Sequence, residues 1–136
     1  MDNIMAEVEY MGELRTQATH LKSGQTITSD APTDNLGKGE AFSPTDLVSS
    51  ALSSCMMTIM GQVANRENID LKGLKADVVK IMSPNPRKIA EVKINFSHPN
   101  LKATDVQKQK LKNAAITCPV ALSLSDSLKQ TITFNF

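Results

Sequence analysis

The chain has 136 residues and a mass of 14.8 kDa, which is enough for one ordinary domain and short for two, so a single domain over residues 1–136 is expected. Its 40% hydrophobic content, 21% charged content and formal net charge of +1 are typical of a soluble globular protein and give no support for nucleic-acid binding. The N-terminal sequence MDNIMAEVEYMGEL lacks the basic and apolar regions of a signal peptide. A cytoplasmic location with reduced cysteines is therefore expected.

The first thirty residues are predicted to form three strands. Apolar residues at Val8, Tyr10, Leu14 and Ala18 alternate with polar residues, as in a half-buried strand. The segment KSGQ predicts a turn, and TITSD a short third strand. The next segment, APTDNLGKGEAF, is rich in Gly, Pro and Asn and is predicted to be an irregular loop.

A long helix is predicted over residues 44–66. Ser43 suits the N-cap, Pro44 suits the first helical position, and Asp46 lies three residues after the cap. The segment LVSSALSSCMMTIMGQVAN, residues 47–65, contains no charged residue, which favours a central helix buried on most sides by a sheet and by a partner subunit. Its five hydroxyl side chains make it too polar for a membrane span, so no membrane insertion is expected.

The second half of the chain repeats the pattern of strands followed by helices. GLKADVVKIMS and IAEVKINFS are predicted strands, the second with clean alternation of apolar and polar residues. Thr104 and Gln107 form a capping-box pattern that opens a helix. Pro119 suits the first turn of a short further helix with Cys118 at its N-cap, and QTITFNF closes the chain as a strand. The order of elements predicts an α+β fold.

The two cysteines, Cys55 and Cys118, are the main candidates for chemistry. No CxxC motif is present, and with only two histidines no spacing suggests a metal site, so no metal or cofactor is expected. The commoner interpretation of Cys55 is a small buried apolar residue. Cys118 is predicted to face the N–H groups at a helix N-terminus, which favour a thiolate. Two thiols brought together by folding can pass through a sulfenic acid to a disulfide and back.

Three blocks of sequence in order resemble the OsmC/Ohr family, named for osmotic induction and organic hydroperoxide resistance. They are SGQTITSDAP, FSPTDLVSSALSSCMMTIMGQVANRENIDLKGLKADV and NAAITCPVALSLSDSLKQTITF. The resemblance implies an OsmC-like fold, with antiparallel sheets wrapped around the long central helices of an intertwined homodimer. It also implies a thiol peroxidase that acts on small organic hydroperoxides. Cys55 would be the peroxidatic cysteine, Cys118 the resolving cysteine, and an external dithiol such as a lipoyl group the reductant.

The chain departs from the family pattern at one position. In the hydroperoxidase branch a Glu directly follows the Pro of the motif and orients an Arg that stabilises the thiolate, whereas Thr45 stands here. Asp46 is expected to cap the helix, and Glu40 is either a substitute for the Glu or a solvated loop charge. Arg15 is the expected arginine, with a solvent-facing strand residue as an equal alternative and His20 as a less favoured stand-in. Without the Glu, Arg15 is predicted to lack its orienting group and the peroxidase to be weakened.

Two other hypotheses fit the same residues. A noncatalytic protein of this fold would bind a small apolar or thioester-like ligand, with Met56, Met57 and Met60 lining an adaptable pocket. In the simpler alternative, both cysteines only pack the core.

Overall fold

The structure is a computed structural model that describes residues 2–136. Its elements follow the predicted order of three strands, one long helix, two strands, two helices and a final strand, so the α+β prediction is confirmed. A short 3-10 helix, η1, lies in the predicted loop. In chain order the elements are β1 (Ala6–Gly12), β2 (Arg15–His20), β3 (Thr26–Asp30), η1 (Thr33–Asn35), α1 (Pro44–Arg66), β4 (Lys75–Pro84), β5 (Arg87–Ser97), α2 (Asp105–Ile116), α3 (Pro119–Ser123) and β6 (Lys129–Asn135).

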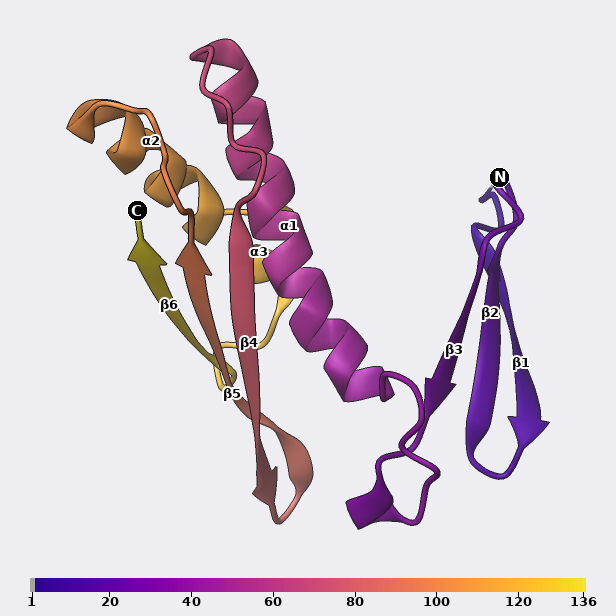
Figure 1. The fold of residues 1–136 in the computed structure, drawn as a ribbon. Coiled ribbons are helices and arrows are strands. Elements are labelled where there is room, and N and C mark those ends of the chain that lie inside the picture. The colour runs from indigo at the N-terminus through magenta and orange to yellow at the C-terminus, as the bar shows by residue number, and fades with distance from the viewer. Residues whose placement is uncertain (1) are drawn as a thin grey trace. The chain divides into compact units, whose positions relative to one another are not determined.

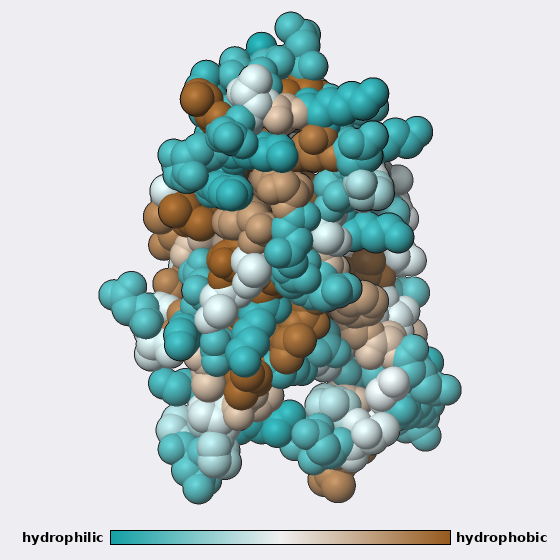
Figure 2. All heavy atoms as spheres, turned by 60° about the vertical axis from the view of Figure 1, so that its left-hand side comes forward, coloured by the Kyte–Doolittle hydropathy of each residue, from teal (hydrophilic) through white to brown (hydrophobic). Residues whose placement is uncertain are grey.

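The chain divides into two compact units, the first ending at Leu47 and the second running from Val48 to Phe136. The single domain expected from chain length stays a prediction. The two units differ in charge: residues 1–47 carry eight acidic and three basic side chains, whereas residues 48–136 carry six and twelve. Figure 2 shows the side of the second unit that bears α2 and β6, where hydrophilic side chains surround smaller hydrophobic patches.

The first unit is an antiparallel sheet of β1, β2 and β3 (Figure 1). A turn between β1 and β2 interrupts the predicted alternation, because Glu13 and Leu14 adopt positive φ angles of 55° and 62°. Val8 and Tyr10 are 67% and 64% exposed in the single chain, although their pattern predicts a buried face. Among residues 2–47 the buried side chains are polar, and they are Ser29, Asp30 and Ser43.

The first turn of α1 forms the cap that the sequence predicts. The Asp46 N–H donates to Ser43 Oγ at 3.1 Å, and the Ser43 N–H donates to Asp46 Oδ2 at 3.0 Å. Two backbone donors that have no partner within the helix are satisfied in this way. The helix therefore begins at Pro44 and runs unbroken to Arg66.

The second unit packs α1 and α2 with a three-stranded sheet in the order β4-β5-β6. β4 and β5 are antiparallel and β5 and β6 are parallel, so this sheet is mixed and not antiparallel throughout as the family resemblance implied. Alternate residues of β5 point into the core, where Phe96 is fully buried and stacks on Phe134 with ring centroids 5.5 Å apart. The predicted apolar face of β5 runs through Ala90, Val92, Ile94 and Phe96. It is confirmed at the last three, which are buried, and Ala90 is half-buried.

One side of α1 faces this core and the other does not. Leu52, Met56 and Met60 are fully buried, whereas Ala51 and Thr58 are exposed in the single chain. The predicted burial on most sides is therefore only partly met within one chain. By length and composition alone α1 is long and apolar enough to cross a membrane, so the prediction that this segment is too polar for a span is wrong. The core helix of a soluble protein passes the same test, and Leu52, Met56 and Met60 of α1 are buried in the core.

Candidate functional site

Cys55 lies in the middle of α1 and is half-buried. It packs against the core of the second unit beside Met56. The next turn of α1 on its outer side is polar, where the Thr58 hydroxyl donates to the carbonyl of Ser54 at 2.9 Å. The Cys55 thiol therefore lies at the border between the apolar core and the uncharged outer face of the helix.

Cys118 lies where α2 gives way to α3, and its side chain is fully buried. Pro119 occupies the first turn of α3, and Cys118 is the N-cap, with its sulfur accepting from the Ala121 N–H at 3.4 Å. The Cys118 N–H in turn donates to the carbonyl of Ala115 at 3.3 Å. The predicted N-cap position of this cysteine is confirmed.

Folding brings the two sulfurs together within the second unit. Burial raises the pKa of the Cys118 thiol, the Ala121 N–H opposes that rise, and the neighbouring Cys55 thiol raises the pKa further by hydrogen bonding and by charge. The predicted stabilisation of a Cys118 thiolate by the helix N-terminus is thus outweighed by burial. Cys118 stays protonated at neutral pH, and the partly exposed Cys55 is the thiol that solvent can reach.

Arg15 belongs to the first unit, at the start of β2. Its Nε donates to Asp30 Oδ1 at 2.7 Å and its Nη2 to Asp30 Oδ2 at 2.8 Å, so one edge of the guanidinium is held by both carboxylate oxygens. Nη2 also donates to Glu40 Oε1 at 3.2 Å. The prediction that Arg15 lacks an orienting group is wrong.

Asp30 is the residue that the sequence reasoning missed. The antiparallel register of β2 and β3 sets Arg15 directly opposite Asp30, and this register is not visible in either strand alone. The Arg15 guanidinium holds the pKa of the Asp30 carboxyl below its ordinary value, and Asp30 raises the pKa of Arg15 in return. A signal was available, because an Asp that ends a third strand can face an Arg that begins the second.

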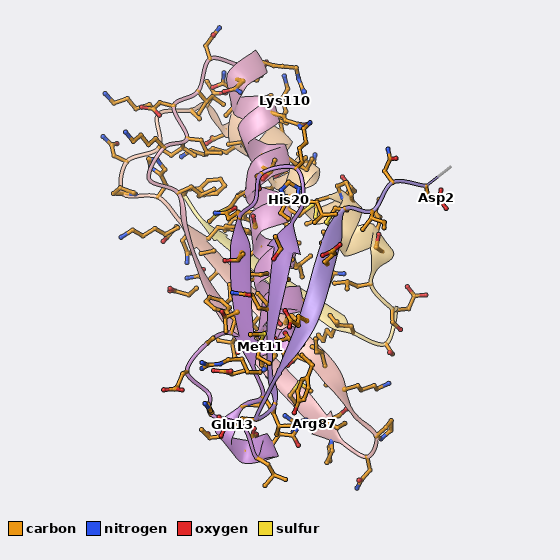
Figure 3. The ribbon with its side chains drawn as sticks, turned by 90° about the vertical axis from the view of Figure 1, so that its right-hand side faces the viewer. Asp2, Met11, Glu13, His20, Arg87 and Lys110 are labelled. Atoms are coloured by element: carbon orange, nitrogen blue, oxygen red, sulfur yellow. The ribbon has the colours of Figure 1, made fainter. Side chains whose placement is uncertain are left out.

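The other polar candidates have local roles. Asp46 caps α1 as predicted, and the Thr45 hydroxyl lies 3.2 Å from Ser43 Oγ. The sequence predicts Glu40 to be either a substitute for the missing Glu or a solvated loop charge. It has features of both, since it pairs with Arg15 and its side chain is 67% exposed. His20 Nδ1 lies 2.6 Å from Ser23 Oγ. Figure 3 shows His20 at one end of the β1–β3 sheet and Glu13, near the start of β2, at the other.

A surface cavity of about 380 Å³ adjoins Arg15 in the first unit. Its other lining residues include Gln17, Thr28 and Lys38, and Lys38 pairs with Glu13 at 2.6 Å. Among residues 2–136 no three His, Cys, Asp or Glu side chains are grouped so that they could hold a metal ion.

The sequence model of the OsmC-like protein family matches residues 37–133. No protein of curated function matches the chain. A crystal structure of a provisionally assigned osmotic stress induced and detoxification response protein from Psychrobacter arcticus 273-4 is 42% identical, with a TM-score of 0.95 over 99% of this chain and 98% of that one.

Two more distant structures share the fold. The organic hydroperoxide resistance protein OsmC from Legionella pneumophila is 15% identical, with a TM-score of 0.71 over 100% of both chains. The organic hydroperoxide resistance protein OhrB of Bacillus subtilis is 20% identical, with a TM-score of 0.62 over 97% of this chain and 98% of that one. At these identities the likeness establishes the fold, and the predicted OsmC-like fold is confirmed.

Proposed function

Because this chain belongs to the OsmC-like family, we propose that it is a cytoplasmic thiol-dependent peroxidase that reduces organic hydroperoxides. The observation that carries the proposal is the meeting of Cys55 and Cys118 in the second unit, with Cys118 buried at the N-cap of α3 and Cys55 partly exposed on α1. Structural neighbours named for organic hydroperoxide resistance support the same class of substrate.

The proposed reaction has three steps. The Cys55 thiolate attacks the distal oxygen of ROOH, the O–O bond breaks, the leaving oxygen takes a proton and departs as ROH, and Cys55 becomes a sulfenic acid. The Cys118 thiol then displaces that hydroxyl group as water, which forms the Cys55–Cys118 disulfide. An external dithiol, such as a lipoyl group, reduces the disulfide to two thiols and is itself oxidised to a disulfide.

The surroundings of the two thiols suit this division of roles. The peroxidatic thiol has to be accessible to the hydroperoxide, whereas the resolving thiol has to reach the sulfenic acid and to lose its proton as it attacks. Cys118 is sealed from solvent and its pKa is raised, so it fits the resolving role. Arg15 remains the cation that the family resemblance predicts for stabilising the thiolate and the departing oxygen.

A homodimer is part of the proposal. Val8 and Tyr10 of the first unit and Ala51 of α1 are exposed in the single chain, which is the expected state of surfaces that a second copy covers. The acidic first unit and the basic second unit also offer complementary charge for contacts between copies. Light scattering at moderate salt is expected to give twice the chain mass, and a mass of 14.8 kDa at micromolar concentration would contradict the dimer.

Thiol titration tests the proposed chemistry directly. One equivalent of an alkyl hydroperoxide added to the reduced protein is expected to remove both thiols and to leave an intrachain crosslink between Cys55 and Cys118, which peptide mass mapping identifies. Hydrogen peroxide at the same concentration serves as the comparison oxidant. If both thiols remain after addition of the organic hydroperoxide, the proposed peroxidase activity is contradicted, and the result favours cysteines that only pack the core.

No observation favours the alternative of a noncatalytic ligand-binding protein. Met56 and Met60 are fully buried in the core of the second unit and Met57 packs against it. These side chains fill the interior, which is the commoner role of methionine.

A further inference from the structure

Strand β6 carries a polar residue on its apolar face. Ile132 and Phe134 pack against the core of the second unit, and Gln130 lies two residues before Ile132, on the same face of the strand. The sheet register agrees, because Gln130 pairs with Val92, which is fully buried on β5. A half-buried amide in this setting lowers stability unless it is hydrogen-bonded. Packing of the core alone therefore does not explain a glutamine at this position.

The side-chain amide of Gln130 has a specific acceptor on another element. Its Nε2 donates to the backbone carbonyl of Ala121 at 3.0 Å. Ala121 lies in the middle of α3, which has five residues, so its carbonyl is among the last four, which have no partner within a helix. A helix as short as α3 is not stable by itself in water. Contacts from outside the helix, such as the one from Gln130, therefore fix its position.

Ala121 is also the residue that holds the Cys118 sulfur. The Ala121 N–H donates to Cys118 Sγ at 3.4 Å, and both residues are buried. Hydrogen bonding also links the Cys118 thiol to the Cys55 thiol. Two hydrogen bonds therefore connect Gln130 of β6 through Ala121 to the buried thiol, and all of these residues belong to the second unit.

We propose that Gln130 is a positioning residue for the resolving step, holding α3 so that the Cys118 sulfur stays within reach of the sulfenic acid on Cys55. This inference rests on the proposed function. In that step the Cys118 sulfur attacks the Cys55 sulfur, the S–O bond breaks, and the hydroxyl group leaves as water with the proton of Cys118. Cys118 is oxidised and the sulfenic acid is reduced to the disulfide, so no other reactant is consumed. Gln130 takes part in no bond exchange and acts only on the place of the attacking sulfur.

Gln130→Met tests this role, because methionine has a similar length and volume but no N–H donor. After one equivalent of an alkyl hydroperoxide, the Cys55 sulfenic acid is expected to live about tenfold longer than in the wild type, while its rate of formation changes by less than about twofold. Stopped-flow mixing with delayed addition of a dimedone-type reagent measures both steps. Equal slowing of both steps together with a lower melting temperature would indicate a merely structural role and would overturn the inference.

Gln109→Met is the matched control for this substitution. Gln109 Nε2 donates to Asn113 Oδ1 at 2.9 Å on the exposed side of α2, so the same change removes the same kind of donor at a distance from the first turn of α3. Both rates are expected to stay within about twofold of the wild type. A sulfenic acid that lives no longer in Gln130→Met than in Gln109→Met contradicts the assignment of Gln130.

A second background shows whether Gln130 acts through Cys118. In Cys118→Ser the Cys55 sulfenic acid has no internal partner, so adding Gln130→Met is expected to change its lifetime by less than about twofold. A further change of about tenfold in that background would mean that Gln130 acts on Cys55 by another route, and the inference would then be wrong.

Two further measurements cover the remaining ways in which the test can fail. If Gln130→Met does not fold, Gln130→Glu decides, because an ionised glutamate keeps the shape of the side chain and offers no donor. A sulfenic acid that lives about tenfold longer supports the inference, and a wild-type lifetime overturns it.

If the wild-type protein reduces no hydroperoxide, the proposed function fails, and oxidation by glutathione disulfide tests the inference by itself. Cys55 attacks glutathione disulfide and forms a mixed disulfide, from which Cys118 displaces glutathione as a thiol. Mass spectrometry of acid-quenched samples follows the mixed disulfide. This displacement is expected to slow about tenfold in Gln130→Met and not in Gln109→Met, and equal rates in the two variants would overturn the inference.

Discussion

Replacing Cys55 with Ser is expected to abolish the reduction of organic hydroperoxides, with a loss of roughly three orders of magnitude or more in kcat/KM. A serine hydroxyl at neutral pH is a far weaker nucleophile than a thiolate, and Cys118 is unable to take over because it is fully buried and its pKa is raised. The loss of activity is measured as the rate at which an alkyl hydroperoxide is consumed in the presence of a dithiol, monitored with a colorimetric peroxide assay.

Cys118→Ser is the matched control, because it removes the other sulfur and leaves the nucleophile in place. This variant is expected to consume about one equivalent of hydroperoxide rapidly and then to slow, since the Cys55 sulfenic acid has no internal partner. A dimedone-type reagent should trap that sulfenic acid on Cys55. Equal, slow consumption by the wild type and by Cys55→Ser would refute the assignment of the nucleophile.

Phe96→Ala is expected to have the largest effect on stability, a loss of about 3–5 kcal/mol in the free energy of unfolding. Phe96 is fully buried on β5 and stacks on Phe134 of β6 at an interplanar angle of 17°. Its removal leaves a cavity where the parallel pair of strands meets the core. Urea unfolding followed by circular dichroism, at one protein concentration for all variants, gives the value.

Val106→Ala provides the comparison for the core substitution. Val106 is 68% exposed on α2, so its truncation is expected to change stability by less than about 0.5 kcal/mol. If Phe96→Ala cost no more than Val106→Ala, the stack of Phe96 and Phe134 would not be part of the stabilising core.

The parts of the fold that the sequence predicts well are those set by local chemistry. Ser43, Pro44 and Asp46 specify the start of α1 through a cap made within four residues, and Thr104 with Gln107 does the same for α2, with both reciprocal bonds present at 3.0–3.1 Å. The alternation along β5 predicts which of its residues are buried because the period of a strand is fixed by its backbone.

The parts that the sequence does not predict depend on contacts between distant segments. The pairing of Arg15 with Asp30 requires the register of β2 and β3, which neither strand specifies alone. Val8 belongs to an alternating pattern, yet it is exposed in the single chain. An alternating pattern predicts that one face of a strand is apolar, but it does not predict which other surface covers that face. The state of Cys118 depends on the balance between a favourable helix N-terminus and burial, and only the folded core shows that burial prevails.

The burial of Cys118 also dictates where a reductant attacks. Once the two cysteines are joined, the half-exposed sulfur on α1 is the one that an incoming dithiol can approach in line, and the sealed sulfur on α3 is the leaving group. A thiol with a raised pKa departs slowly, so regeneration rather than peroxide attack is expected to set the turnover rate. The transient mixed disulfide would therefore form on Cys55 of α1.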